Sequence, residues 1–105
     1  MSGYNLPMGI LPLNKCVIYA LVDPRDGCVR YVGATSEPSA RLKEHMRHKG
    51  TSSRDEWIRD LVKEKFKPVF VFLDSVQAEK AHEAELEWIA HFGAISELHN
   101  YKSKK

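Results

Sequence analysis

The stretch "CVIYALVDPRDGCVRYVGA", residues 16–34, decides the fold because it holds two strand patterns joined by a turn. Residues 16–22 and 28–34 are rich in the β-branched and aromatic side chains that favour strands. The intervening "DPRDG" combines Pro and Gly, which are typical of turns. The stretch therefore predicts a β-hairpin. Because side chains alternate between the two faces of a strand, Tyr19 and Tyr31 converge if both strands turn these residues to the same side.

The residues after the hairpin predict a first helix over Pro38–His48. Ser36 is a suitable N-cap, and Gly50 is placed to end the helix. Leu42 and Met46 lie one turn apart and form an apolar stripe. We therefore expect these two side chains to face the core.

A second helix, a third strand and a third helix follow. The second helix is predicted within residues 50–66, with a capping box of Ser53 and Glu56 and a stripe of Trp57, Ile58, Leu61 and Val62. Residues 67–76 predict a strand with apolar side chains on both faces, so we expect it at the centre of the sheet. Residues 78–92 predict the last helix, which Gly93 ends.

The order ββααβα predicts an α+β fold, in which helices flank a three-stranded, mainly antiparallel sheet. A length of 105 residues is that of one ordinary domain. We divide the chain into an N-terminal arm over 1–14, a domain over 15–101 and a basic tail over 102–105. The arm contains Pro7 and Pro12 and lacks a charged start, so we interpret it as an extended segment and not as a signal peptide.

The bulk composition indicates a globular protein without a membrane partner. Hydrophobic residues make up 43% and charged residues 29%, and no apolar run is long enough to span a bilayer. Cys16 and Cys28 fall at opposite ends of the hairpin, too far apart to bond. We expect reduced, buried cysteines and a cytoplasmic location.

Net charge alone argues weakly for nucleic acid, because it is only +2. Its distribution says slightly more. Residues 1–50 hold seven Lys and Arg against four Asp and Glu, whereas residues 51–105 hold nine against ten. The positive excess therefore lies in the first half and in the "YKSKK" end.

Arg41, His45 and His48 share a stripe of the first helix, at i, i+4 and i+7. A solvated polar face is the simpler interpretation. Strand tyrosines that only stack across the hairpin, and a Gly33 that only ends a strand, are the corresponding simpler interpretations there.

Glu85 falls in the middle of the apolar face of the third helix, where a carboxylate costs desolvation free energy unless it is paired or binds a metal. A salt bridge to Arg41 and a metal site are equally suitable explanations. The histidines and cysteines show no zinc spacing. A single carboxylate instead suits Mg²⁺, which keeps its waters and takes other ligands from a phosphate.

Taken in order, these pieces resemble the GIY-YIG nuclease superfamily. The resemblance rests on "VIY" at 17–19, "YVG" at 31–33, Arg41 and His45 in "RLKEH", Glu85 in "EAELEWI" and Asn100 in "LHN". It covers about residues 16–101. The first motif has Val17 and Ile18 before its tyrosine and lacks the family's glycine, a departure that concerns local strand geometry and removes no catalytic group.

The resemblance implies a divalent-metal-dependent endonuclease that hydrolyses phosphodiester bonds, with one Mg²⁺ or Mn²⁺ per active site. Glu85 would hold the metal, and Tyr19 would contact the attacking water. His45 would orient Tyr19 or accept its proton, and Arg41 would stabilise the transition state. Asn100 would fix the phosphate or Tyr19.

The resemblance also implies how nucleic acid is held. Tyr31 would donate to a phosphate oxygen or contact the nucleophile, and Gly33 would let the phosphate approach the backbone. Lys43, Arg47 and Lys49 would contact flanking phosphates without reading sequence. DNA is the expected substrate more than RNA, and a homodimer or a partner protein would supply targeting, for which the chain has no added domain.

Two other readings stay open at this point. One is a non-catalytic nucleic-acid-binding module on the same fold. The other is an interaction domain in which Arg41 and Glu85 form a salt bridge and the tyrosines only pack.

Overall fold

The computed structural model describes residues 14–93. In order, the elements are β1 Lys15–Asp23, β2 Cys28–Thr35, α1 Pro38–Arg47, α2 Ser53–Lys63, β3 Val69–Gln77, the short 3₁₀ helix η1 Ala78–Lys80 and α3 Ala81–Gly93. The α+β fold and the order ββααβα are confirmed. Most of the expected arm over 1–14, the tail over 102–105 and Asn100 lie outside the described residues.

Within residues 14–93, one antiparallel sheet has the strand order β2-β1-β3. The expectation that the third strand is central was wrong, because β1 pairs with both neighbours and β3 lies at an edge. Five consecutive side chains of β1 are buried, whereas Phe72 of β3 is 61% exposed. Both strands carry apolar side chains on both faces, so the two-residue period alone did not distinguish the centre from the edge.

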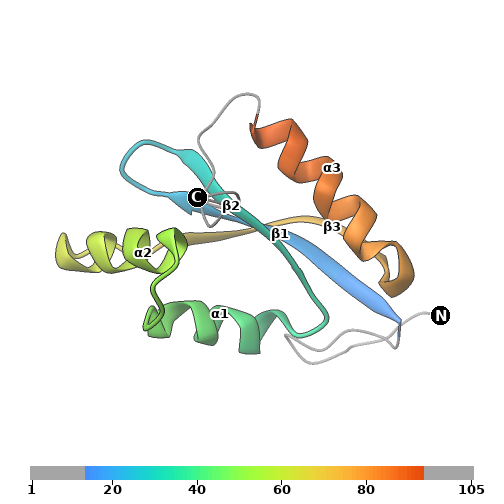
Figure 1. The fold of residues 1–105 in the computed structure, drawn as a ribbon, viewed down its shortest axis with the longest axis horizontal. Helices are drawn as coiled ribbons and strands as arrows, with labels where there is room; N and C mark the ends of the chain where they lie inside the picture. The colour runs from blue at the N-terminus through green and yellow to red at the C-terminus, as the bar shows by residue number, and fades with distance from the viewer. Residues whose placement is uncertain (1–13, 94–105) are drawn as a thin grey trace.

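The helices cover both faces of the sheet, with α1 and α2 on one face and α3 on the other (Figure 1). On the first face, β1 packs against the middle of α2 through Val17, Tyr19, Leu21, Trp57, Ile58 and Leu61. On the second face, Ile18 and Val32 pack against Ile89 of α3. Val62, expected in the apolar stripe of α2, is 41% exposed.

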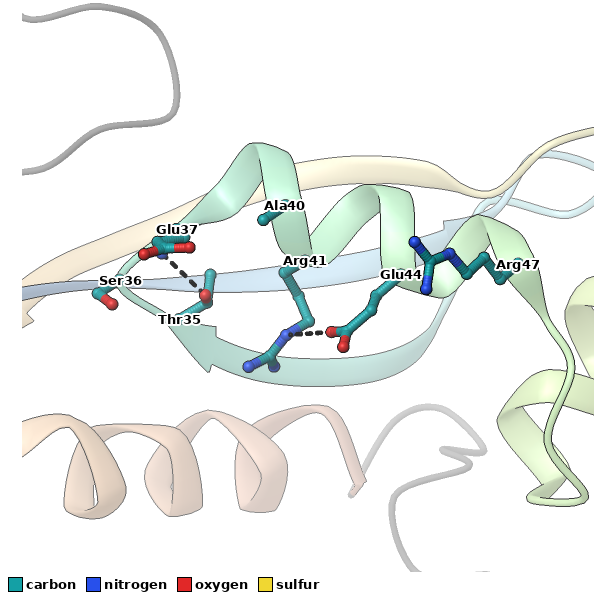
Figure 2. A pocket seen from close by; sticks show the side chains of 7 residues that line it. All are labelled: Thr35, Ser36, Glu37, Ala40, Arg41, Glu44 and Arg47. Atoms are coloured by element: carbon teal, nitrogen blue, oxygen red, sulfur yellow. Dashed lines mark hydrogen bonds and ion pairs between the residues drawn. The ribbon is translucent and has the colours of Figure 1, made fainter.

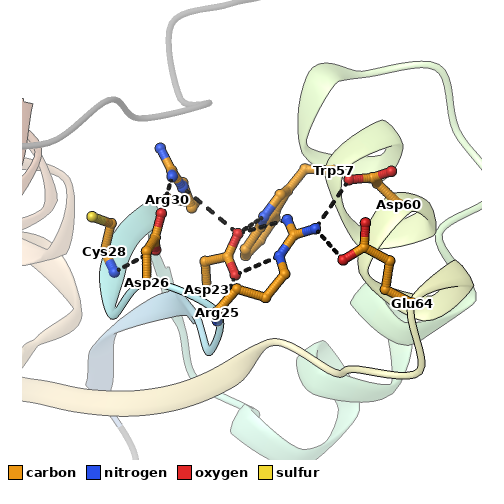
Figure 3. Close-up of polar contacts among 8 residues, drawn as sticks. All are labelled: Asp23, Arg25, Asp26, Cys28, Arg30, Trp57, Asp60 and Glu64. Carbon is orange, nitrogen blue, oxygen red and sulfur yellow. Dashed lines mark hydrogen bonds and ion pairs between the residues drawn. The ribbon is translucent and has the colours of Figure 1, made fainter.

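The turn between β1 and β2 is joined to α2 by a buried carboxylate, Asp23 (Figure 3). Arg25 donates to both Asp23 oxygens at 2.8 and 2.9 Å, and Trp57 Nε1 donates at 2.9 Å. These donors, led by Arg25, hold the pKa of Asp23 well below its usual range. Arg25 also reaches two acids of α2, Asp60 and Glu64, at 3.2 and 3.1 Å.

The first helix begins at Pro38 as predicted, but its capping residues and its buried face differ from expectation. Its N-cap is Glu37, whose N–H donates to Thr35 Oγ1 at 2.9 Å, and not Ser36. It ends at Arg47, and His48 takes the left-handed C-cap conformation with φ 36°, so Gly50 does not end it. The buried residue of this helix is His45, while Leu42 and Met46 are only partly buried.

The second helix begins one residue earlier than the predicted capping box. Ser52 is the N-cap, and its Oγ accepts from the Asp55 N–H at 3.1 Å. The same S-x-x-acid spacing fits Ser52 with Asp55 and Ser53 with Glu56, so the sequence allowed either pair.

Cys16 and Cys28 are free, as predicted, but both are partly exposed and not buried. Among the described residues, no helix is long and apolar enough to cross a membrane.

Candidate active site

Tyr19 lies in the middle of the central strand and is fully buried. Its ring stacks on Phe70 of β3, with centroids 4.6 Å apart and planes 10° apart. Directly across the hairpin is Gly33, where an added Cβ would lie 2.5 Å from the Tyr19 hydroxyl. The glycine therefore makes room for the tyrosine ring, and its expected role in admitting a phosphate stays a prediction.

A buried hydrogen bond of 2.7 Å joins the Tyr19 hydroxyl to His45 Nε2. Burial, followed by the positive charges of Arg54 and Arg41, lowers the pKa of His45 to about 4. The imidazole is therefore neutral near pH 7. In the tautomer protonated at Nδ1, the Tyr19 hydroxyl donates to Nε2.

Tyr19 is held as a neutral phenol. Burial raises its pKa, and the nearby Tyr31 raises it further, while the positively charged Arg41 acts in the opposite direction. A phenol in this environment is a poor base by itself. It is well suited to pass a proton between a group on one side and His45 on the other.

The two tyrosines converge on one face of the hairpin, as predicted, with ring centroids 6.3 Å apart. The Tyr31 ring also meets the His45 ring edge to face, at 5.4 Å. Unlike Tyr19, Tyr31 is partly exposed and lines an open pocket of about 390 Å³. The other residues lining this pocket are Arg41, Glu44, His45, Arg47, Lys49, Gly50, Arg54 and Asp55.

Arg41 lines both this pocket and a second pocket of about 400 Å³ that extends along α1 (Figure 2). Its side chain points toward the end of β2, where Nη1 lies 3.5 Å from the Ala34 carbonyl oxygen. Its Nε forms an ion pair with Glu44 at 3.2 Å, drawn as a dashed line in Figure 2. The expected partner Glu85 therefore does not hold this guanidinium.

Glu85 is half-buried on α3, and burial raises the pKa of its carboxyl group, opposed by the nearby charges of His82 and Arg41. Within residues 14–93 it has no hydrogen bond and no ion pair. Arg41 on α1 and Glu85 on α3 thus influence each other although their helices cover opposite faces of the sheet. No group of three or more metal-binding side chains occurs in this part of the chain.

The other predicted contacts are distributed unevenly. Lys43, Arg47 and Lys49 are all exposed, but only Arg47 and Lys49 line the pocket that contains Tyr31. His48 acts through its backbone, since its carbonyl accepts from Arg59 of α2. Asn100 falls outside the described residues.

Sequence reasoning missed the arginine that α2 contributes to this pocket, Arg54. Its guanidinium carbon lies 5.0 Å from the centre of the Tyr31 ring. The available signal was a cation placed in the first turn of a helix, where the helix dipole disfavours positive charge.

A model of the GIY-YIG catalytic domain matches residues 15–102 of this chain, which is most of its length. No curated protein and no solved structure matches it.

Proposed function

Because the chain belongs to the GIY-YIG family of nuclease-type catalytic domains, we propose that it is a divalent-metal-dependent endonuclease that hydrolyses phosphodiester bonds, in DNA more than in RNA. The observation that carries this proposal is the buried hydrogen bond between the Tyr19 hydroxyl and neutral His45. A neutral imidazole in contact with a phenol, beside a pocket lined by arginines, is the arrangement that proton transfer at a bound phosphate needs.

Glu85 is the residue proposed to hold the metal. Its carboxylate is half-buried and has no hydrogen bond or ion pair within residues 14–93, so a cation would offset its desolvation. A single carboxylate fits Mg²⁺ or Mn²⁺, which take their remaining ligands from water and phosphate. When bound, the ion would supply charge stabilisation at the phosphate and its leaving oxygen. Asn100 is proposed to complete this side of the site.

In the proposed reaction, a water oxygen attacks phosphorus in line with the leaving oxygen, and the P–O bond opposite it breaks. The water proton passes to the Tyr19 hydroxyl, whose own proton moves along the 2.7 Å hydrogen bond to His45 Nε2. His45 is the acceptor because burial makes Tyr19 too weak an acid to lose its proton alone. Tyr19 is fully buried, so substrate binding must shift Tyr31 or Arg41 to admit the water.

The remaining polar residues are proposed to bind phosphate. Arg41 would leave Glu44 and stabilise the negative charge that develops on the scissile phosphate. Tyr31 would donate to a phosphate oxygen from the wall of the pocket. Arg47 and Lys49, and Lys43 further out on α1, would contact flanking phosphates. A homodimer or a partner protein would provide targeting.

The test is incubation of the purified protein with supercoiled, linear, branched and single-stranded DNA and with RNA, in Mg²⁺, Mn²⁺ or EDTA. We expect cleavage only with metal, and its loss in Glu85→Gln and Tyr19→Phe. Glu83→Gln is the matched control, because Glu83 is an exposed acid of the same helix. Cleavage by Glu85→Gln at the wild-type rate would contradict the proposed mechanism.

The full burial of Tyr19 favours a second candidate, a non-catalytic nucleic-acid-binding module. In this candidate function, the Tyr19 hydroxyl contributes to packing and not to catalysis. Salt-sensitive binding of nucleic acid without cleavage under any metal condition would establish this function instead.

A further inference from the structure

Arg54 is a second arginine in the pocket that contains Tyr31 and Arg41, and the proposed reaction assigns it no role. It lies in the first turn of α2, and its side chain is 27% exposed. The guanidinium carbon lies 5.0 Å from the centre of the Tyr31 ring, a cation–π distance. This contact holds the guanidinium beside the pocket.

Packing leaves part of this side chain unsatisfied. Arg54 Nε is buried, and within the part of the chain that the structure describes it has no hydrogen-bond partner. The ion pair from Nη2 to Asp55 is 3.7 Å long, beyond the range of a good hydrogen bond. The same Asp55 oxygen lies 3.3 Å from Ser52 Oγ. A buried guanidinium N–H without an acceptor is costly, which is a reason to look for a ligand.

The charge around Arg54 points to an anion. Four cationic side chains, Arg41, Arg47, Lys49 and Arg54, line the pocket with two carboxylates, Glu44 and Asp55. Arg54 also stands at the positive end of the α2 dipole, which disfavours a cation and favours a negative group. An anion bound here would offset the repulsion among the four cations and the unfavourable interaction of Arg54 with the helix dipole.

We propose that Arg54 binds a backbone phosphate of nucleic acid in this pocket, beside Tyr31 and Arg41, an inference that rests on the proposed function. Guanidinium is suited to this because Nε and an Nη atom can donate together to two phosphate oxygens. A phosphate that draws the guanidinium toward the pocket gives Nε the acceptor it lacks.

The same contact would assist proton transfer. Arg54 and Arg41 are the two positive charges that lower the pKa of His45, after burial. A phosphate between the two arginines offsets their field at the imidazole. Binding of the substrate would thus make His45 a better acceptor of the Tyr19 proton during the reaction.

The experiment measures binding of a fluorescent DNA duplex by anisotropy in EDTA, over a series of salt concentrations. We expect Arg54→Gln to weaken binding about tenfold and to reduce the slope of log K against log salt by about 0.9, the value for one lost phosphate contact. Arg54→Lys should keep the slope but bind more weakly, because an ammonium cannot donate through a planar fork. The matched control is Lys63→Gln, which removes one exposed positive charge from the last turn of the same helix.

The outcomes separate the two proposals. Arg54→Gln that binds with the wild-type affinity and slope overturns this inference and leaves the proposed function standing. Wild-type protein that binds no nucleic acid overturns both. If circular dichroism shows that Arg54→Gln does not fold, Arg54→Lys decides, and wild-type affinity in that variant overturns the inference.

Discussion

Tyr19 and His45 each bury a polar group, and each satisfies the other. The two residues are therefore part of the core as well as of the candidate site. Replacing either one leaves a buried donor or acceptor without a partner, at a cost of about 1–3 kcal/mol. Activity losses at these positions have to be compared with the stability of the same variants.

The histidine gives the fold a measurable pH dependence. Folded His45 has a pKa of about 4, below the ordinary histidine pKa of about 6.5 that applies when the chain unfolds. Between these values the unfolded chain binds the proton and the folded chain does not. The contribution of neutral His45 to the free energy of unfolding is fully present above pH 6.5, and it is lost as the pH drops toward 4. At pH 5 we expect a loss of about 2 kcal/mol relative to pH 7, measured by urea unfolding.

Two variants show whether His45 causes this slope. His45→Gln should be less stable at pH 7 and should lose this part of the pH dependence. His91→Gln removes an exposed histidine and should keep the wild-type slope. If His45→Gln keeps that slope as well, another group is responsible.

Gly33 supplies the second prediction at this scale. In Gly33→Ala the new Cβ would lie 2.5 Å from the Tyr19 hydroxyl and 2.6 Å from Cζ. The ring cannot move away easily, because it is fully buried and stacked on Phe70. We expect a loss of about 1–3 kcal/mol in the free energy of unfolding, measured with urea, and a loss of cleavage. Wild-type stability combined with lost DNA binding would instead support a role in phosphate approach.

At the scale of elements, the strands were predictable from local patterns and their arrangement was not. The pattern in residues 16–34 predicted the hairpin, whereas the shared face of Tyr19 and Tyr31 follows from the observed register of β1 with β2. The central place of β1 depends on pairing with β3, more than 45 residues away along the chain. The register of that pairing shifts between Ile18 and Tyr19, at the strand position that carries the candidate catalytic phenol.

The buried face of α1, which carries part of the candidate site, was also not predictable from local patterns. Hydrophobicity favoured Leu42 and Met46 as the inward stripe, but the structure buries His45. A histidine is buried in a core where another group forms a hydrogen bond to its ring, and here that group is the Tyr19 hydroxyl on a different element, β1. Arg54 was missed for a related reason, since its pocket is assembled from β2, α1 and α2.

The start of α2 is a local feature that can be tested separately. Ser52 Oγ accepts from the Asp55 N–H at 3.1 Å, so Ser52→Ala should destabilise the protein by about 1 kcal/mol. Thr51→Ala is the matched control, since Thr51 is exposed and precedes the cap. Urea unfolding of both variants measures the difference. Equal stability of the two would show that Ser52 does not cap the helix.

At the scale of the whole molecule, the candidate site depends on elements from both faces of the sheet. Tyr19 and Tyr31 come from β1 and β2, Arg41 and His45 from α1, and Glu85 from α3. The position of α2 is fixed partly by the buried Asp23, which accepts from Trp57 (Figure 3) and lies at the end of β1, four residues after Tyr19. This contact should therefore stabilise the fold without taking part in the chemistry.

Asp23→Asn tests that separation. The amide preserves the shape and can still accept from Trp57, but it loses the charge that faces Arg25 and turns an N–H₂ toward other donors. We expect the free energy of unfolding to fall by about 2–3 kcal/mol, measured with urea.

Asp26→Asn, the control, changes an exposed acid of the same turn and should have a much smaller effect on the free energy of unfolding. Neither residue lines the pockets at Arg41, so cleavage by the folded fraction of each variant should equal that of the wild type. A selective loss of cleavage in fully folded Asp23→Asn would mean that the turn network also sets the geometry of the site.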